Sequence, residues 1–148
     1  MAILRGECHC GRVEVCFETA LSPGELEVRA CQCSFCRRHG AKVVTDAAGR
    51  LVISVEDGAL VRYRFGLRTA DFLLCRNCGV YIAAVISDGT EERATLNAAG
   101  MMIQGLWDRA AEPIRLDHED AEARRKRRHR NWTPTKVVVE MAVARGSG

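Results

Sequence analysis

Three short cysteine clusters constrain the fold of this sequence more than any other feature. They are Cys8-His9-Cys10-Gly11, Cys31-Gln32-Cys33-Ser34-Phe35-Cys36 and Cys75-Arg76-Asn77-Cys78-Gly79. Zinc takes four ligands in a tetrahedron, and two cysteines separated by one or two residues can reach one ion from a tight turn. Glycine after the second cysteine lets the backbone turn sharply. The clusters therefore predict that seven of the eight cysteines hold metal.

The number of ligands predicts two different sites, because seven ligands do not make two sets of four. A structural zinc is closed by four protein ligands, whereas a catalytic zinc keeps one position for water or substrate. We expect the two outer pairs to form a closed site and the central triplet to form an open one. The closed site would contain Cys8, Cys10, Cys75 and Cys78, and the open site Cys31, Cys33 and Cys36.

Cysteines can also form disulfides, ligate iron–sulfur clusters or build a second closed zinc site. Disulfides are disfavoured in a reducing compartment, and the usual spacings of iron–sulfur ligands differ from these. A second four-ligand structural zinc would need Cys16, His9 or His39 as its last ligand. Cys16 lies within a predicted strand, where an inert core thiol is expected, and the two histidines are expected at the surface or beside a metal ligand rather than on the metal.

Alternating apolar and polar residues predict a mainly β fold. Val13 to Phe17 has the period of a half-buried strand, and Glu25 to Ala30 alternates in the same way up to the central triplet. Further short strands are expected between turn-forming residues. They are Leu51 to Val55, Val61 to Phe65, Phe72 to Leu74, Val80 to Ile86 and Ala94 to Leu96.

One helix is expected near the C-terminus, over Asp117 to Arg130, with acidic residues early and arginines late, as the helix dipole favours. Pro134 should follow its end, and Arg145 to Gly148 should be frayed. The length of 148 residues suits a single domain over 1–148, with a core of about 4–112 and a basic helix and tail of about 113–148. No signal peptide or membrane-length apolar run is evident, so a cytoplasmic location is expected.

The cysteine motifs resemble those of the glutathione-dependent formaldehyde-activating enzyme family, which also includes centromere protein V. The resemblance rests on Gly6 to Val13, Cys31 to Ala41 and Phe72 to Gly79, together with Thr95-Leu96-Asn97. It implies a β-tent type zinc-bound fold of short antiparallel strands, and two zinc ions per chain. In the family the first and last pairs hold the structural zinc and the triplet holds the zinc assigned to catalysis.

The resemblance also implies a carbon–sulfur lyase, acting like an S-(hydroxymethyl)glutathione synthase on a thiol such as glutathione and a small aldehyde such as formaldehyde. Arg37, Arg38, His39 and Lys42 follow the triplet and are candidates to bind the carboxylates of a peptide-like thiol. The last 40 residues do not resemble the family's usual ending.

A basic run supports an alternative function. Six of the 22 basic residues lie between Arg124 and Arg130. The rest of the chain has 16 basic and 19 acidic residues, so the excess of positive charge is confined to this run. The run is interpreted as a solvated helix face in preference to a patch for nucleic acid. The alternative is a non-catalytic zinc-stabilised module that engages nucleic acid or protein through this helix.

Overall fold

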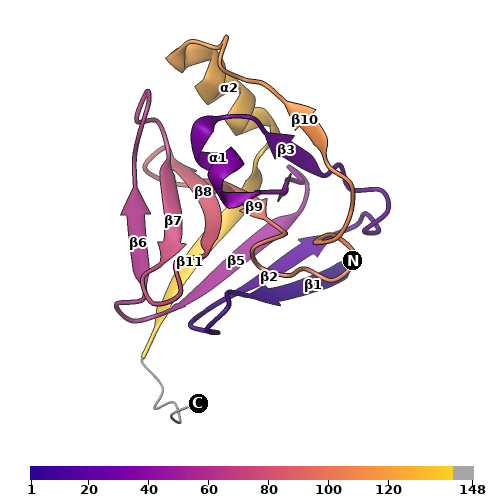
Figure 1. Ribbon diagram of the computed structural model, residues 1–148, viewed down its shortest axis with the longest axis vertical. Helices are drawn as coiled ribbons and strands as arrows, with labels where there is room; N and C mark the ends of the chain where they lie inside the picture. Colours follow the sequence, from indigo (N-terminus) through magenta and orange to yellow (C-terminus); the bar gives the residue numbers. More distant parts are fainter. Residues whose placement is uncertain (142–148) are drawn as a thin grey trace.

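The computed structural model describes residues 1–141 and contains one branched sheet and two helices (Figure 1). Strands make up 41% of the chain and helices 12%, which confirms the mainly β expectation. No helix among the described residues is long and apolar enough to span a membrane. The elements are β1 (Ala2–Glu7), β2 (Val13–Thr19), β3 (Arg29–Cys31), α1 (Ser34–His39), β4 (Val43–Val44), β5 (Arg50–Glu56), β6 (Leu60–Tyr63), β7 (Asp71–Cys75), β8 (Tyr81–Ser87), β9 (Glu92–Asn97), β10 (Glu112–Ile114), α2 (Ala121–Asn131) and β11 (Thr133–Glu140).

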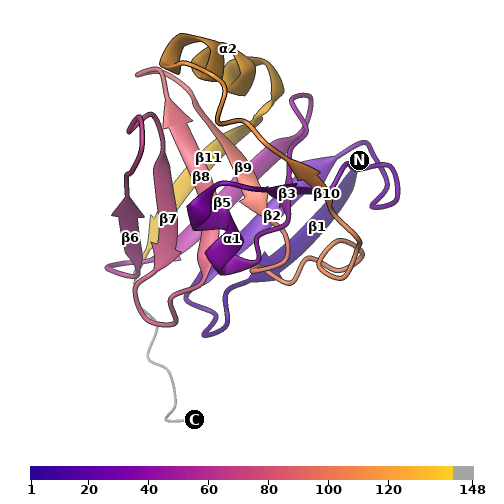
Figure 2. The same ribbon diagram turned by 45° about the horizontal axis from the view of Figure 1, so that its top comes forward.

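The strands run in the order β1-β2-β5-β11-β9-β4-β3-β10, and a second branch, β8-β7-β6, leaves from β9. Most neighbours are antiparallel, as expected, but β11 runs parallel to β5 and β10 runs parallel to β3. These two parallel pairs were not expected from the sequence. They arise because strands far apart along the chain meet without a hairpin between them. Figure 2 shows α2 above one end of the sheet and α1 in front of β8 and β9.

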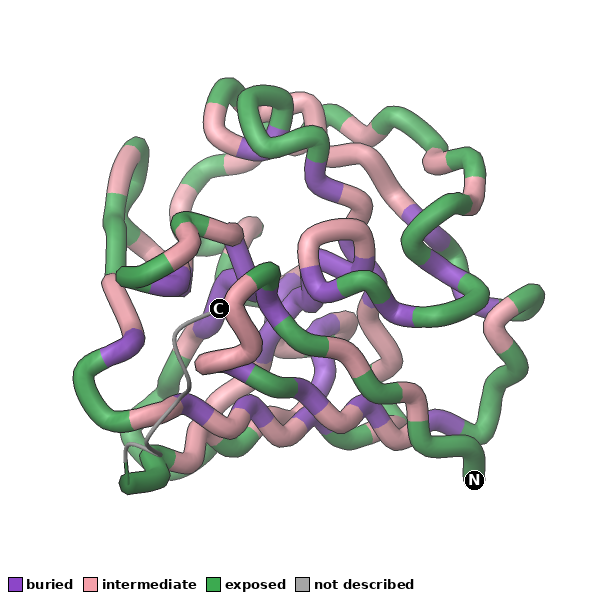
Figure 3. The backbone as a smooth tube through the Cα atoms, turned by 60° about the horizontal axis from the view of Figure 1, so that its bottom comes forward, coloured by how far each residue is buried: buried purple, intermediate pink, exposed green. Residues whose placement is uncertain are grey.

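Part of the main core is formed where β2 lies against β5. Their register pairs Val13 with Val55, Val15 with Ile53 and Phe17 with Leu51. All six side chains are at most 1% exposed. Burying such side chains contributes about 1.5–3 kcal/mol each. Figure 3 shows the same pattern for the described residues, with buried residues inside the trace and exposed residues at many of its turns.

Among residues 1–141 the structure contains six of the seven predicted strands, and four strands that were not predicted: β1, β4, β10 and β11. The strands expected at Val13 to Phe17 and Leu51 to Val55 are present. The strand expected over Glu25 to Ala30 is wrong for most of its length, because a turn binds the amides of Glu25 and Leu26 to the carbonyl of Ser22. Only Arg29–Cys31 is a strand there.

The helix near the C-terminus begins later than predicted and is not the last element. Asp120 is the N-cap, and its Oδ1 accepts a hydrogen bond of 2.8 Å from the amide of Ala123. After Asn131 the chain continues into β11, which lies between β5 and β9 in the sheet. The residues from Arg145 to Gly148, which the sequence suggested were frayed, lie outside the described residues.

Gly6 lets β1 approach the segment after β9. A Cβ atom at Gly6 would overlap the carbonyl oxygen of Met101 and lie 2.6 Å from Cδ1 of Ile103. Gly6→Ala is therefore expected to destabilise the protein by about 1–3 kcal/mol, the usual cost of overpacking, measured by urea unfolding. Gly24→Ala is the matched control, since nothing lies within 4 Å of a Cβ atom there. Equal midpoints for both variants would contradict this account of Gly6.

Candidate metal centres and the cavity beside them

The turns after β1 and after β7 bring together Cys8, Cys10, Cys75 and Cys78, whose sulfur atoms lie within 4.8 Å of one another. The Sγ atom of Cys10 is 3.7 Å from that of Cys8 and 3.6 Å from that of Cys75. A tetrahedral zinc with bonds of about 2.3 Å separates its sulfur ligands by about 3.8 Å, whereas a disulfide needs about 2.05 Å. The four-cysteine cluster therefore has the dimensions of a metal site.

The two turns are built alike. Gly11 and Gly79 both have φ of 79°, a left-handed conformation that favours glycine. The amide of Gly11 bonds the carbonyl of Cys8, and the amide of Gly79 bonds that of Cys75. The amide of Val13 also reaches the Sγ atom of Cys8 at 3.4 Å. Each turn thus holds its cysteine pair on one side of a tight bend.

Burial and neighbouring polar groups shift the pKa values of the thiols in the four-cysteine cluster. Burial raises the pKa of Cys8 to about 12. Burial would also raise the pKa of Cys10, but hydrogen bonds from Asn77 and Arg12 outweigh it and lower that pKa to about 5. A buried group of thiols cannot all carry charge unless a cation compensates them. The donor set of this cluster thus fits a divalent metal.

The triplet lies at the junction of β3 and α1. Cys31 ends β3, Cys33 is the N-cap of α1, and Cys36 is buried in the helix. Their sulfur atoms lie within 4.8 Å of one another. The Sγ atom of Cys33 accepts a hydrogen bond of 3.4 Å from the amide of Cys36. The first turn of α1 therefore holds the thiol of Cys33 close to those of Cys31 and Cys36.

Mutual hydrogen bonds dominate the titration of the triplet. The pKa of Cys33 is lowered to about 2 because the thiols of Cys31 and Cys36 bond its thiolate. The pKa of Cys36 is raised by the same two neighbours and by burial. Loss of all three protons therefore requires a positive charge between the sulfurs, and a metal ion would provide it.

No fourth metal-binding side chain joins the triplet among residues 1–141. Cys16 lies on β2, where its Sγ accepts a hydrogen bond of 3.0 Å from Arg5. His39 packs its ring on Phe35, with centroids 4.4 Å apart. His9 also stays outside both clusters. The geometry therefore supports one cluster of four thiols and one of three.

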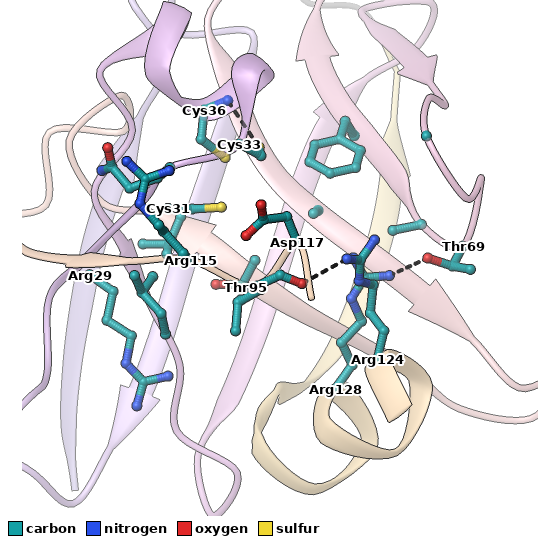
Figure 4. Close-up of a pocket in the computed structure, with 18 of the residues that line it drawn as sticks. Arg29, Cys31, Cys33, Cys36, Thr69, Thr95, Arg115, Asp117, Arg124 and Arg128 are labelled. Carbon is teal, nitrogen blue, oxygen red and sulfur yellow. Dashed lines mark hydrogen bonds between the residues drawn. The ribbon is translucent and has the colours of Figure 1, made fainter. Parts of the chain in front are cut away.

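The triplet opens onto a cavity of about 500 Å³. The cavity runs from α1, between β8 and the segment before α2, to the inward face of α2 (Figure 4). Its apolar side includes Phe65, Phe72, Tyr81 and Trp132. The ring of Phe72 lies 5.8 Å from that of Tyr81 and 4.6 Å from that of Phe65. A small organic molecule beside the triplet would therefore meet aromatic surface.

The predicted substrate-binding residues lie at different places. Arg37 lines the cavity. Arg38 instead donates to the carbonyl of Ser34 at 3.0 Å within α1, and neither it nor His39 lines the cavity. Lys42 donates to the carbonyls of Trp107 and Arg109, so its ammonium group holds a loop. Among these four candidates, the structure brings only Arg37 to the cavity.

Three arginines of α2 line the cavity and were missed in the sequence. Arg124, Arg127 and Arg128 stand at i, i+3 and i+4, a spacing that places side chains on one helical face. The interpretation of the whole run as a solvated face is therefore wrong for these three, whereas Arg125, Lys126 and Arg130 are exposed. The spacing alone was the available signal, because nothing in the sequence says which face meets the sheet.

Asn97, part of the downstream motif, has a structural place. Its amide nitrogen donates to the carbonyl of Tyr81 at 2.9 Å, and its oxygen accepts from the amide of Lys42 at 3.1 Å. The side chain is 2% exposed. It links β8 and β9 to the segment that follows α1, and so helps to hold α1 and its cysteines against the sheet.

Comparisons with known proteins agree with this arrangement. The family model described as "Glutathione-dependent formaldehyde-activating enzyme" matches residues 3–115. A crystal structure of a Rhodobacter sphaeroides protein, determined as a structural genomics target, is 37% identical. The match covers 74% of this chain and 97% of that one, with a TM-score of 0.55. The comparison with curated proteins finds no match. The segment that matches the family contains both cysteine clusters and ends before α2.

Proposed function

The chain belongs to the glutathione-dependent formaldehyde-activating enzyme family, and we propose on this basis that it is a zinc-dependent carbon–sulfur lyase. The proposed substrate is the adduct of a small thiol, such as glutathione, with a small aldehyde, such as formaldehyde. The proposed cofactors are two zinc ions per chain. Cys8, Cys10, Cys75 and Cys78 would hold the structural ion, and Cys31, Cys33 and Cys36 the catalytic one.

The observation that carries the proposal is the position of the triplet. Three thiols with no fourth protein ligand in the described chain lie in the wall of a cavity large enough for a small organic molecule. When bound there, zinc would supply an open coordination position that can take a thiol sulfur or polarise a carbonyl oxygen. A site built only for structure would gain nothing from such an opening.

The chain's own residues would bind and orient the adduct. Phe65, Phe72 and Trp132 offer apolar surface that keeps water from the reacting carbon. The hydroxyl of Tyr81 is buried, has no hydrogen-bond partner among the described residues, and is available to donate to a substrate oxygen. Burial raises the pKa of Tyr81 well above its ordinary value, so the hydroxyl keeps its proton. Arg37 adds a positive charge at the same wall.

The direct test is whether the zinc-loaded protein accelerates formation of the adduct. Glutathione and formaldehyde combine without a catalyst, so the exchange between free and hydroxymethylated thiol is measured by NMR with and without protein. We expect the exchange rate to rise in proportion to protein concentration, by several-fold or more at micromolar protein. No acceleration with glutathione, with other small thiols, or with other small aldehydes would contradict the proposal.

A further inference from the structure

Arg128 is a buried cation without a matching anion. Arg128 is only 8% exposed, yet it forms no ion pair with any carboxylate in residues 1–141. One guanidinium nitrogen, Nη1, donates to Oγ1 of Thr69 at 2.7 Å, and Cζ lies 4.8 Å from the ring centre of Trp132. The Nε atom is buried and has no hydrogen-bond partner. Such a group is costly to bury unless something completes its bonds.

The neighbouring arginines differ from Arg128 in this respect. Arg127 binds Glu119 through two nitrogens, at 2.7 and 3.0 Å. Arg124 binds the carbonyl of Leu116 at 2.8 Å and contacts Glu119 at 3.5 Å. The carboxylate of Glu119 is therefore already shared by two guanidinium groups. Arg128 forms no direct ion pair with Glu119, which attracts it only at longer range.

Arg128 keeps this charge at neutral pH. Its pKa is lowered to about 10, first by burial and then by repulsion from Arg127 and Arg124. A group with that pKa is almost fully protonated at pH 7. The cavity thus holds a permanent cation whose hydrogen-bonding capacity is only partly used.

Arg128 and the triplet share the cavity and lie at different ends of it. Figure 4 places Cys33 and Cys36 at one side of the cavity and Arg128 beside Thr69 at the other. Tyr81, whose hydroxyl has no hydrogen-bond partner among the described residues, lines the same cavity as the triplet and Arg128. A molecule whose sulfur lies at the triplet would extend along Tyr81 toward a buried guanidinium.

The charges that line the cavity favour an anion. Asp117 is the one carboxylate among the described lining residues, and it is exposed. Six arginines also line the cavity: Arg29, Arg37, Arg115, Arg124, Arg127 and Arg128. Among these six, Arg128 combines deep burial with an unsatisfied donor. Guanidinium groups bind carboxylates through paired hydrogen bonds, a geometry that ammonium groups cannot match.

We propose that Arg128 binds a carboxylate of the substrate at the end of the cavity away from the triplet, so that the enzyme selects thiol adducts bearing a carboxylate remote from their sulfur. This inference rests on the proposed function and narrows its substrate class. Arg128 also lies beyond residues 3–115, the segment that matches the family. The selectivity would therefore come from the part of this chain that the family match does not cover.

The test compares binding of two probes that differ only in their carboxylates. S-methylglutathione and its dimethyl ester are titrated into the zinc-loaded full chain by calorimetry. The methyl group blocks the sulfur, so neither probe can turn over. Wild type is expected to bind the acid about 10- to 100-fold more tightly than the ester, as for a charge-assisted hydrogen bond in a desolvated site. Arg128→Met is expected to reduce this ratio to near one.

Matched variants separate recognition from folding. Arg125→Met removes an exposed arginine of the same helix and should keep the wild-type ratio. Arg128→Lys keeps the charge but loses the paired donors, so its ratio should fall between those of wild type and Arg128→Met. If Arg128→Met does not fold, the ratio measured for Arg128→Lys decides the test. An equal affinity of wild type for acid and ester, or an undiminished ratio in folded Arg128→Met or Arg128→Lys, would overturn the inference.

The result of the binding experiment is independent of the result of the turnover experiment. A protein that accelerates adduct formation but binds acid and ester equally would keep its proposed function and lose this inference. A protein that shows the Arg128-dependent ratio without any acceleration would lose the proposed reaction and keep the carboxylate site.

Discussion

Replacing Cys78 with alanine is expected to unfold the protein at room temperature. The residue contributes one of the four thiols that join the turn after β1 to the turn after β7. Zinc binding at such sites contributes on the order of 10 kcal/mol to folding, comparable with the whole stability of a small domain. Three remaining thiols would bind the ion far more weakly and leave a buried cluster without its counter-charge. We expect a loss of zinc and of cooperative thermal unfolding, measured by metal analysis and circular dichroism.

Cys16→Ala is the control for Cys78→Ala. Cys16 belongs to neither cluster and contacts Arg5 near the edge of the sheet. This variant should keep the wild-type metal content and melt within a few degrees of wild type. A cooperative transition for Cys78→Ala close to that of Cys16→Ala, with zinc still bound, would show that the four-cysteine cluster does not stabilise the fold.

Replacing Cys33 has the opposite expected pattern, with activity lost and the fold kept. The triplet lies beside the cavity and joins only the neighbouring elements β3 and α1, so its metal closes no long segment of chain. Without Cys33 the remaining two thiols would not retain the second zinc. We expect Cys33→Ala to reduce turnover by about 10³-fold or more, since the proposed Lewis acid would be absent. Bound zinc should fall by about half.

Cys33→Ser separates the metal role of Cys33 from its role as helix cap. The thiol accepts a hydrogen bond from the amide of Cys36, and loss of a cap costs about 1 kcal/mol. Serine is a good N-cap but a poor zinc ligand. Cys33→Ser should therefore be as stable as wild type and as inactive as Cys33→Ala. Turnover near the wild-type rate in either variant would exclude catalysis that depends on this thiol.

The sequence allowed prediction of those features that depend on residues close together along the chain. The alternation of Val13, Val15 and Phe17 identified β2, because a half-buried strand needs only its own pattern. The cysteine spacings identified the turns, because a tight bend is local. The meeting of Cys8 with Cys75 followed only from counting ligands, and the structure brings these two turns together.

Features that depend on distant contacts escaped prediction. β11 pairs with β5 in parallel, and nothing between the two strands signals that partnership. The run Val137 to Val139 has the β-branched residues typical of a strand, but it does not identify the strand's partner. The inward face of α2 escaped for a related reason, because a run with arginine at almost every position has no apolar stripe. Burial of Arg128 is decided by the sheet beneath it.

The central position of β11 links the C-terminal part of the chain to the segment that matches the family model. β11 lies between β5 and β9, and it is reached only after α2. A fragment ending at residue 115 would leave both neighbouring strands with open edges prone to self-association. The final strand thus anchors the C-terminal end of α2 to the sheet beside the cavity. Because α2 carries no cysteine of either cluster, substitutions on its inward face would change the lining of the cavity and leave the metal-binding turns unchanged.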